Sequence, residues 1–392
     1  MIEPVFQPPP LTDLDHEVLG LIEELRVQLR YRVAEPRRWT ANLRRMTLAH
    51  SVQGSNSIEG YLATLDDVAA AVDDEPTLSA SEETEQALHG YRDAMTYVLQ
   101  VAQDPSATID ASLLKALHFM MLRHDLAMRP GRWRAGFVGV HDERSGELVY
   151  HAPDAERVPA LIDAMLDRLS GDDQPPLVRA AMTHLNLVMI HPFRDGNGRM
   201  ARCLQTLVLA REQIVTPVLS SIEEELGRDA RAYYDVLAEV GQGRWRPERS
   251  TRPWLRFCLT AHYRQAKTHL RRVNETEHLW IACADLVEQR RLPERATGPL
   301  LDAASGLRIR NPSYRATVEM TAAEEISELT ASRELKALVD AGLLRPVGAN
   351  RARYYLAAPP LTALRDAIRA TRPPREAFDP FAVARAHDRA HL

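Results

Sequence analysis

The sequence of 392 residues is poor in cysteine, in aromatic residues and in excess charge of one sign. Its three cysteines, Cys203, Cys258 and Cys283, lack the C-x-x-C spacing typical of metal and redox sites. Three thiols cannot all pair within one chain, so we expect reduced structural thiols and a cytoplasmic location. A net charge of −5 also lacks the basic excess typical of nonspecific nucleic-acid binding.

Long apolar runs are missing as well. No window of ~18 apolar residues occurs, so we expect no membrane span and no membrane partner. The start, Met1 to Pro4, has no basic run followed by an apolar stretch, so no signal peptide is expected. Hydrophobic residues make up 45% of the chain, enough to build the cores of two or three domains. Only 6% of residues are aromatic while Ala and Leu abound, which favours a mainly α fold.

Apolar residues recur at spacings of three and four along most of the chain, which predicts amphipathic helices. The predicted helices span Asp13–Val33, Thr40–Val52, Asp66–Val72, Ser81–Gln103, Asp110–Arg123, Ala155–Ser170, Leu177–Ile190, Asn197–Glu212, Gly227–Val240 and Arg252–Arg272. Two β-like runs, 137–140 and 148–150, flank a polar segment and predict a small hairpin.

Beyond about residue 275 the pattern changes. Two short helices are predicted at Thr321–Glu328 and Thr330–Ala341, followed by a two-stranded wing at 343–347 and 353–356. Two helices and a wing are typical of a winged helix-turn-helix domain. The tail after Pro359 is rich in Pro, Ala, Arg and Asp, and we expect part of it to be helical and part disordered.

The strongest chemical signal is the run from His191 to Arg202, which joins two predicted helices. Glycines at 196 and 198 allow backbone N–H groups to converge, and the helix N-terminus behind them favours anions. Arg199 and Arg202 follow one turn apart and suit a polyphosphate. His191 can accept a proton at neutral pH, and Phe193 is expected to plug the loop against the core.

Asp195 precedes this phosphate cradle. A lone carboxylate beside phosphates is the usual way in which proteins hold Mg²⁺. The alternative is that Asp195 merely caps the following helix, and the two roles can coexist.

These residues resemble the signature of the Fic (filamentation induced by cAMP) family at each of its eight specified positions. The matching positions are His191, Phe193, Asp195, Gly196, Asn197, Gly198, Arg199 and Arg202. The resemblance implies a Fic helical core in which His191 deprotonates a Ser, Thr or Tyr hydroxyl of a target protein or of the chain itself. That hydroxyl attacks the α-phosphate of ATP and pyrophosphate leaves. It further implies that Asp195 binds Mg²⁺, that the other matching positions after His191 form the nucleotide site, and that the hairpin holds the target side chain.

A second motif implies that the chain carries its own inhibitory element, or brake. Residues 55–60 resemble the family's inhibitory motif, with Ser55, Glu59 and Gly60 at its defining positions. In the family this glutamate pairs with the second motif arginine, here Arg202, and misaligns ATP. The alternative is that Glu59 is a surface residue at a helix end without a partner. Some relatives use the same glutamate to reverse the modification, and the sequence does not decide between these roles.

The resemblance divides the chain into four parts. These are an N-terminal helical region with the inhibitory motif (1–105), a Fic catalytic core (106–275), a winged helix-turn-helix domain (276–358) and a tail (359–392). Transfer of another nucleotide by the same fold stays open. So does a DNA-binding regulator with a nucleotide-sensing Fic domain.

The charge of the winged segment bears on its partner. Its bases, Arg333, Lys336, Arg345, Arg351 and Arg353, are balanced one for one by acidic residues between 321 and 356. A DNA reader normally shows a positive surplus, so we favour protein contact, in target recognition or in a homodimer.

Overall fold

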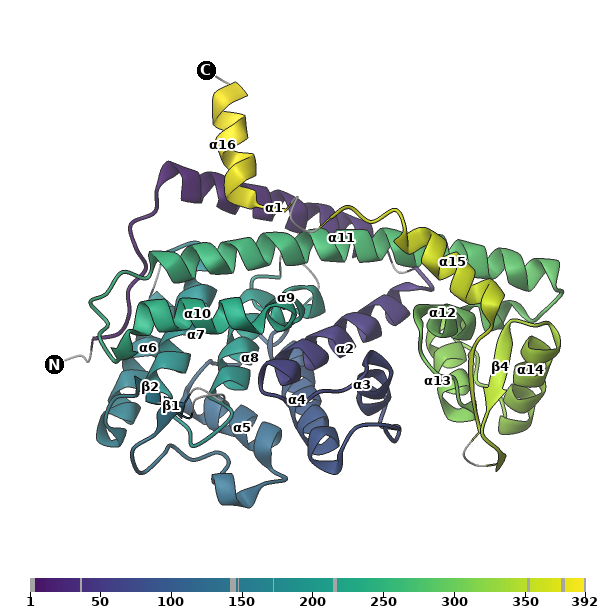
Figure 1. Cartoon of the computed structure of the whole chain (residues 1–392), viewed down its shortest axis with the longest axis horizontal. Coiled ribbons are helices and arrows are strands. Elements are labelled where there is room, and N and C mark those ends of the chain that lie inside the picture. Colours follow the sequence, from purple (N-terminus) through teal and green to yellow (C-terminus); the bar gives the residue numbers. More distant parts are fainter. Residues whose placement is uncertain are drawn as a thin grey trace.

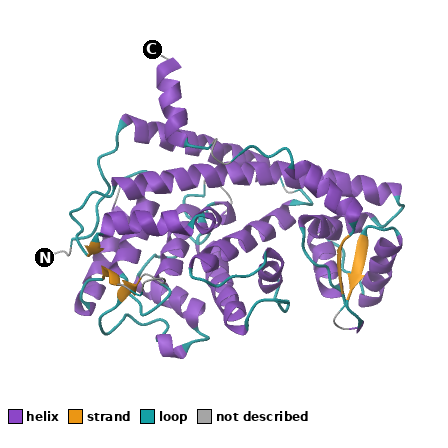
Figure 2. Cartoon of the chain, in the orientation of Figure 1, coloured by secondary structure: helices purple, strands orange, loops and turns teal. Residues whose placement is uncertain are grey.

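The computed structural model describes residues 4–35, 37–141, 146, 148–171, 173–213, 217–350, 353–374 and 378–390. These residues are mainly helical, with two small sheets (Figure 2). None of the described helices is both long enough and apolar enough to cross a bilayer. The predicted mainly α class is confirmed.

The N-terminal and central helices form the larger part of the molecule (Figure 1). They are α1 (Asp13–Ala34), α2 (Thr40–Ile58), α3 (Leu65–Val72), α4 (Glu82–Val101), α5 (Ala111–Leu122), α6 (Val158–Gly171), α7 (Pro176–Ile190), α8 (Asn197–Ala210), α9 (Glu223–Arg228) and α10 (Ala230–Gly241). Short 3₁₀ turns lie at Leu126–Met128, Ala155–Arg157 and Pro217–Leu219. Apart from α2 and the unforeseen α9, these helices begin and end within three residues of the predicted bounds.

Helix α8 lies at the centre of this bundle. Every residue of α8 except Gly198 is buried, whereas a surface helix would keep one polar face. Its apolar side packs among α4, α5, α6 and α7 in one of two hydrophobic clusters. The three cysteines are free and buried, which confirms their structural assignment. Because the α8 backbone is fixed on all sides, the residues of its first turns are held rigidly.

Helix α2 is longer than predicted because Gly54 does not end it. A Cβ at this position would lie 2.3 Å from the carbonyl oxygen of Glu223, so only glycine allows α2 to pack this closely on α9. The same holds from the other side of the contact, where a Cβ at Gly227 would lie 2.6 Å from the Cα of Gly54. The helix therefore continues to Ile58, and Gly60, at φ +83°, turns the chain away.

The predicted hairpin is present, with a third strand beside it. Strands β1 (Gly139–His141) and β2 (Leu148–His151) pair antiparallel, and β3 (Gly243–Arg244) adds to β2 in parallel. Strand β1 is thus an edge strand. The polar connection of the hairpin lies largely outside the described residues.

One long helix, α11 (Arg252–Gln289), runs the length of the molecule and leads into the C-terminal elements (Figure 1). It passes without interruption through 275/276, where the sequence analysis placed a domain boundary. The following elements are a 3₁₀ turn (Glu294–Ala296), α12 (Thr297–Ser305), α13 (Asn311–Ala322), α14 (Glu328–Asp340), β4 (Leu344–Val347) and β5 (Tyr354–Ala357).

The helix predicted at Thr321–Glu328 is wrong. Helix α13 ends at Ala322, where Ala323 adopts a left-handed conformation, and α14 begins after its N-cap Ser327. Residues 321–328 are therefore mainly a connection between two helices. Strands β4 and β5 pair antiparallel where the wing is predicted, and Arg351 lies outside the described residues.

The tail contributes α15 (Pro359–Arg369) and α16 (Pro380–Ala390). Helix α15 packs against α11 and α12, and α16 packs against α1 and α11. In Figure 1, α15 lies along α11, whereas α16 meets α1 at its start and then projects away from the body.

Candidate active site

The loop between α7 and α8 turns sharply at two residues with positive φ. His191 follows the last residue of α7 at φ +53°, and Gly196 precedes α8 at φ +73°. A left-handed conformation is uncommon for a residue with a Cβ, so the surrounding contacts must hold His191 in place. The two turns bring the imidazole and the N-terminus of α8 to the same short loop.

The imidazole of His191 has a defined tautomer. Its Nδ1 lies 3.2 Å from the carbonyl oxygen of Val188, which can only accept a hydrogen bond. Nδ1 therefore carries the proton and leaves the lone pair of Nε2 free. Burial lowers the pKa of His191 below its ordinary value of 6.5, which favours the neutral form. The site thus contains an imidazole that can act as a base.

Phe193 is the plug that the sequence predicts. Its side chain is fully buried, stacked on His118 at 3.7 Å between ring centroids and packed against Trp133. It presents no side-chain surface to a ligand, so its inclusion among the nucleotide-binding residues is corrected to a packing role. Asn197 fastens the same residue, because its side-chain amide bonds both the N–H and the carbonyl of Phe193.

Two side chains that sequence analysis missed hold this loop. Arg134 is buried and donates from Nε to the carbonyl of His191 at 2.7 Å, while its backbone N–H donates to Pro192. His118 accepts from the N–H of Gly131 and so donates from Nε2 to the carbonyl of Asp195. Burial lowers the pKa of His118 to about 4, which keeps it neutral. Neither residue belongs to a recognisable motif, so no sequence signal distinguishes them.

The start of α8 offers groups suited to an anion. Gly196 has no side chain with which to cap the helix, so its first amides stay available. The guanidinium of Arg199 is buried against the ring of Tyr61, and its Nη2 lies 3.4 Å from Asp195. Its Nε and Nη1 are buried and have no hydrogen-bond partner among the residues that the structure describes. Buried donors of this kind normally have partners, which suggests a missing ligand.

Arg202, one turn further along α8, is bound by the end of α2. Its Nη2 donates to Oε1 of Glu59 at 2.6 Å and to the carbonyl of Ser55 at 3.0 Å, and its Nε donates to Oγ of Ser55 at 2.9 Å. Burial alone would raise the pKa of Glu59, but Arg202 and Arg199 outweigh it and lower that pKa. Glu59 is therefore an ionised partner of a buried guanidinium.

The carboxylate of Glu59 also covers the glycine loop. A Cβ at Gly198 would lie 2.5 Å from Oε1 of Glu59, so only a residue without a side chain leaves room for this carboxylate. Glu59 thus lies directly against the start of α8. An anion that approached Gly198 and Arg202 from this side would meet a negative charge already in place.

Asp195 is partly open to solvent, with 43% of its side chain exposed. No group of three or more His, Cys, Asp or Glu side chains that could hold a metal occurs among the described residues. A cation here would have to take its remaining ligands from water and from a bound molecule.

The structure therefore brings together most of the predicted site residues. His191, Asp195, Gly196, Asn197, Gly198, Arg199 and Arg202 come from one loop and helix, and Ser55 and Glu59 reach it from the end of α2. The side chain of Phe193 is turned into the core, and Gly60 is exposed where the chain turns away after α2. The hairpin is anchored beside them, because the hydroxyl of Tyr150 on β2 donates to the carbonyl of Met189 on α7.

Comparisons with known proteins agree on one family. Residues 108–209 match a model described as "Fic/DOC family". A Protein adenylyltransferase Fic of Nematostella vectensis is 30% identical over 269 residues, which cover 67% of this chain and 58% of that protein. Protein adenylyltransferase fic-1 of Caenorhabditis elegans is 40% identical over 72 residues, or 18% of this chain and 13% of the relative. The chain thus spans less than two thirds of the length of these curated relatives.

Solved structures show that the fold extends beyond the matched segment. A Fic family protein from Desulfovibrio desulfuricans superposes with a TM-score of 0.58 and 23% identity, covering 90% of this chain and 99% of that one. A Fic domain containing signaling protein from Bacteroides thetaiotaomicron covers 67% of this chain and 97% of its own, with a TM-score of 0.52 and 20% identity.

Proposed function

Because this chain belongs to the Fic/DOC family, we propose that it is a protein adenylyltransferase that moves AMP from ATP onto a protein hydroxyl. The observation that carries the proposal is the free Nε2 of His191 beside a loop of uncapped amides and guanidinium nitrogens that have no partner among the described residues. The hydroxyl oxygen of a Ser, Thr or Tyr attacks the α-phosphorus. The bond from that phosphorus to the bridging oxygen breaks and pyrophosphate leaves. Nε2 of His191 takes the proton of the hydroxyl.

The phosphates of ATP fit the start of α8. Nε and Nη1 of Arg199 and Nη1 of Arg202 have no hydrogen-bond partner within the part of the chain that the structure describes, so phosphate oxygens can accept from them. The amides of the glycine loop add further donors, and the rigid α8 holds them in fixed positions. The N-terminus of α8 favours the negative charge that develops on the leaving pyrophosphate.

Asp195 suits Mg²⁺ as one ligand among several. Its half-exposed carboxylate stands beside Arg199, at the edge of the proposed phosphate site, with room for water. When bound, Mg²⁺ would neutralise charge on the phosphates. Asp195 would hold the ion at that edge, while Arg199 and Arg202 hold the phosphates themselves.

Glu59 acts as the brake in this proposal. It occupies the Nη2 of Arg202 and lies against Gly198, both of which a triphosphate would need. A nucleotide bound in its presence is displaced, and its α-phosphate is not aligned with the attacking hydroxyl. Small errors of this kind can lower a rate by ~100-fold. Ser55 completes the brake by orienting the Arg202 guanidinium toward Glu59.

The target hydroxyl is presented by the hairpin. Strand β1 is the outer strand of its sheet, so an extended segment of a target protein can pair with its free edge. In support, the hydroxyl of Tyr150 ties β2 to the carbonyl of Met189 in the last turn of α7, two residues before His191.

The C-terminal elements favour contact with protein over contact with DNA. The cations Arg295 and Lys336 pair with Glu334, Glu324 and Asp340 within the segment, which leaves little positive surplus. We infer that the segment recognises targets or a second copy of the chain.

The choice of nucleotide tests the proposal directly. We expect the Glu59→Gly variant to incorporate label from α-labelled ATP into itself, and at least about tenfold less from UTP, because one base-specific contact is worth ~1.4 kcal/mol or more. Label is counted on the protein band after incubation with Mg²⁺ and each nucleotide. Preferred incorporation from UTP would assign the other transfer reaction. No incorporation from either would refute both.

The rate should depend on pH through His191. Burial lowers its pKa below 6.5 in the folded protein, so the neutral base is present at pH 7 and is lost only as the pH falls through that lowered value. Glu59 raises the pKa of His191, so its removal lowers this value further. We expect kcat/KM of Glu59→Gly to be flat from pH 8 down to about 6.5 and to fall below it. A rate already halved at pH 7 would contradict the neutral-base assignment.

A further inference from the structure

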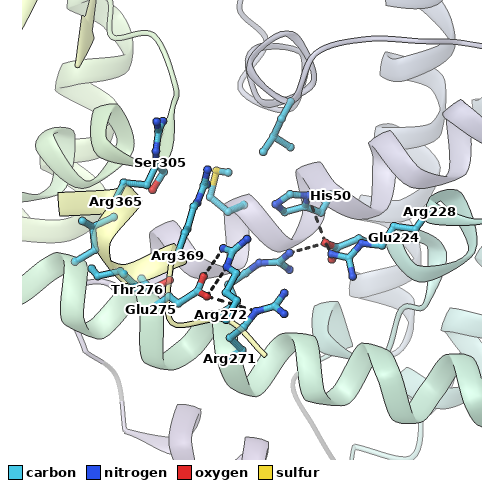
Figure 3. A pocket seen from close by; sticks show the side chains of 15 residues that line it. His50, Glu224, Arg228, Arg271, Arg272, Glu275, Thr276, Ser305, Arg365 and Arg369 are labelled. Carbon is cyan, nitrogen blue, oxygen red and sulfur yellow. Dashed lines mark hydrogen bonds and ion pairs between the residues drawn. The ribbon is translucent and has the colours of Figure 1, made fainter. Parts of the chain in front are cut away.

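A cavity lies away from the catalytic loop, where α2, α9, α11, α12 and α15 meet (Figure 3). Its volume is about 160 Å³. His50 on α2 lines it, nine residues before Glu59, so it is separated from the brake by about 13 Å along the helix axis. None of the residues assigned to the catalytic site lines it.

The lining of this cavity is strongly basic. Six arginines face it, whereas the carboxylates among its described lining residues are Glu224 and Glu275. The arginines are Arg228, Arg271, Arg272, Arg365, Arg369 and Arg372. Burial, followed by nearby arginines, lowers the pKa of His50 to about 3, so the imidazole is neutral and adds no charge. Among the lining residues the arginines therefore outnumber the carboxylates by four. Two of these arginines also pair with carboxylates outside the lining, Arg228 with Glu225 and Arg365 with Asp366.

The two carboxylates are already shared. Glu224 binds Arg228 and, at 2.7 Å, Nη2 of Arg272. Glu275 binds Nη2 of Arg372 at 2.6 Å, and its Oε1 lies 3.4 Å from Nε of Arg271. Each carboxylate thus serves two guanidinium groups and cannot neutralise a third.

Two guanidinium groups keep capacity for a ligand. Nη1 of Arg272 is buried and has no hydrogen-bond partner in the described part of the chain. Arg369, on α15, makes no ion pair within 4 Å with any described carboxylate. Burial first, and then Arg372 and Arg365, lower the pKa of Arg369, which shows that the cations crowd one another.

We propose that this cavity binds a small, multiply charged oxyanion of the diphosphate class. Guanidinium forks match the oxygens of phosphates, and the arginines converge from α11 and α15 on one space (Figure 3). The volume equals that of about five water molecules, which fits inorganic pyrophosphate or the terminal phosphates of a nucleotide.

The bound anion would join two parts of the chain. Arg271 and Arg272 lie on α11, whereas Arg365 and Arg369 lie on α15 beyond the C-terminal strands. Without an anion these like charges repel one another across the contact between the two helices. An oxyanion between them replaces the repulsion by attraction and fastens α15 to α11.

The test is calorimetric titration of the full-length protein with sodium pyrophosphate in EDTA. We expect one site in the wild type, and at least about tenfold weaker binding in Arg365→Gln/Arg369→Gln, because each charge-assisted hydrogen bond contributes ~1.5–3 kcal/mol. Both positions lie on an outer helix, and circular dichroism and a thermal melt check the fold. If the double variant misfolds, the same titration is made with Arg369→Gln alone, and weaker binding than in the wild type is again expected.

Two controls separate this site from others. Arg345→Gln removes an exposed cation from β4 and should bind as the wild type does. Arg199→Gln removes a guanidinium of the catalytic cradle and should also retain the site. If Arg199→Gln loses binding while the α15 variant keeps it, the anion occupies only the cradle and the proposal is refuted. Absence of binding to the wild type refutes it as well.

The source of the anion follows from competing titrations. Tighter binding of ADP than of pyrophosphate would assign the end of a nucleotide, and the reverse order would assign an inorganic ion. If binding of both ligands is lost in Arg365→Gln/Arg369→Gln, the site is supported, whichever ligand binds more tightly. This result does not depend on whether the chain transfers AMP.

Discussion

Replacing Glu59 by glycine should raise the incorporation of AMP into the protein by about 100-fold, because the carboxylate no longer displaces the triphosphate from the position for in-line attack. The substitution releases Nη2 of Arg202 and uncovers Gly198, the two contacts that Glu59 makes at the cradle. Mass spectrometry of the purified variant after incubation with ATP and Mg²⁺ should show a gain of at least one adenylate.

The matched control is Glu35→Gly. Glu35 is the exposed residue that follows the last turn of α1, as Glu59 follows that of α2. Unlike Glu59, it forms no ion pair with Arg202. The Glu35→Gly protein should incorporate no more AMP than the wild type does. Equal labelling of the wild type and Glu59→Gly would show that Glu59 does not inhibit the transfer of AMP.

A stability measurement separates loss of the brake from loss of the fold. Removal of Glu59 leaves Arg202 buried and short of a partner, which destabilises the free protein by up to about 3–5 kcal/mol. ATP supplies new partners, so it should raise the melting temperature of Glu59→Gly more than that of the wild type. An equal shift in both proteins would argue that Glu59 does not compete with nucleotide.

Replacing His191 by alanine in the Glu59→Gly background should lower the rate of transfer by about 10²–10⁴-fold, because a positioned general base contributes that much. The phosphate contacts of Arg199 and Arg202 do not involve the imidazole, so the affinity for ATP should change little. Single-turnover kinetics and nucleotide titration measure the two quantities separately.

His278→Ala is the control for this substitution. His278 is an exposed histidine on α11, outside the proposed site, and its loss should leave the rate unchanged. A His191→Ala variant that transfers AMP as fast as its parent would show that the base is elsewhere. A variant that also fails to bind ATP would indicate collapse of the loop.

The sequence was sufficient to place the catalytic loop because one continuous motif supplies most of it. The run from His191 to Arg202 contains the base, the carboxylate, the glycines and both guanidinium groups, and local backbone geometry brings them together. The groups that hold the loop were not predictable. Arg134 and His118 act by bonding backbone carbonyls of the loop, and such contacts leave no pattern in a single sequence.

A glycine whose function is packing is a poor guide to where a helix ends. The helix predicted at Thr40–Val52 stops before Gly54, but Gly54 lies inside α2 because the backbone of α9 passes too close for a Cβ. The end of α11 was misplaced for a related reason. Its second half packs against the C-terminal elements, and tertiary contacts of that kind extend a helix beyond what local periodicity shows.

The length of α11 sets a scale for any macromolecule that touches both ends of the protein. Its 38 residues form one uninterrupted rod of about 55 Å, with its first turns beside α7 and α10 and its last beside α12. A continuous helix cannot shorten without breaking its hydrogen bonds. Helix α11 therefore fixes the distance between the β1–β2 hairpin and the β4–β5 hairpin. A target that binds at β4 and β5, as proposed above, would therefore need a segment long enough to span that distance to His191.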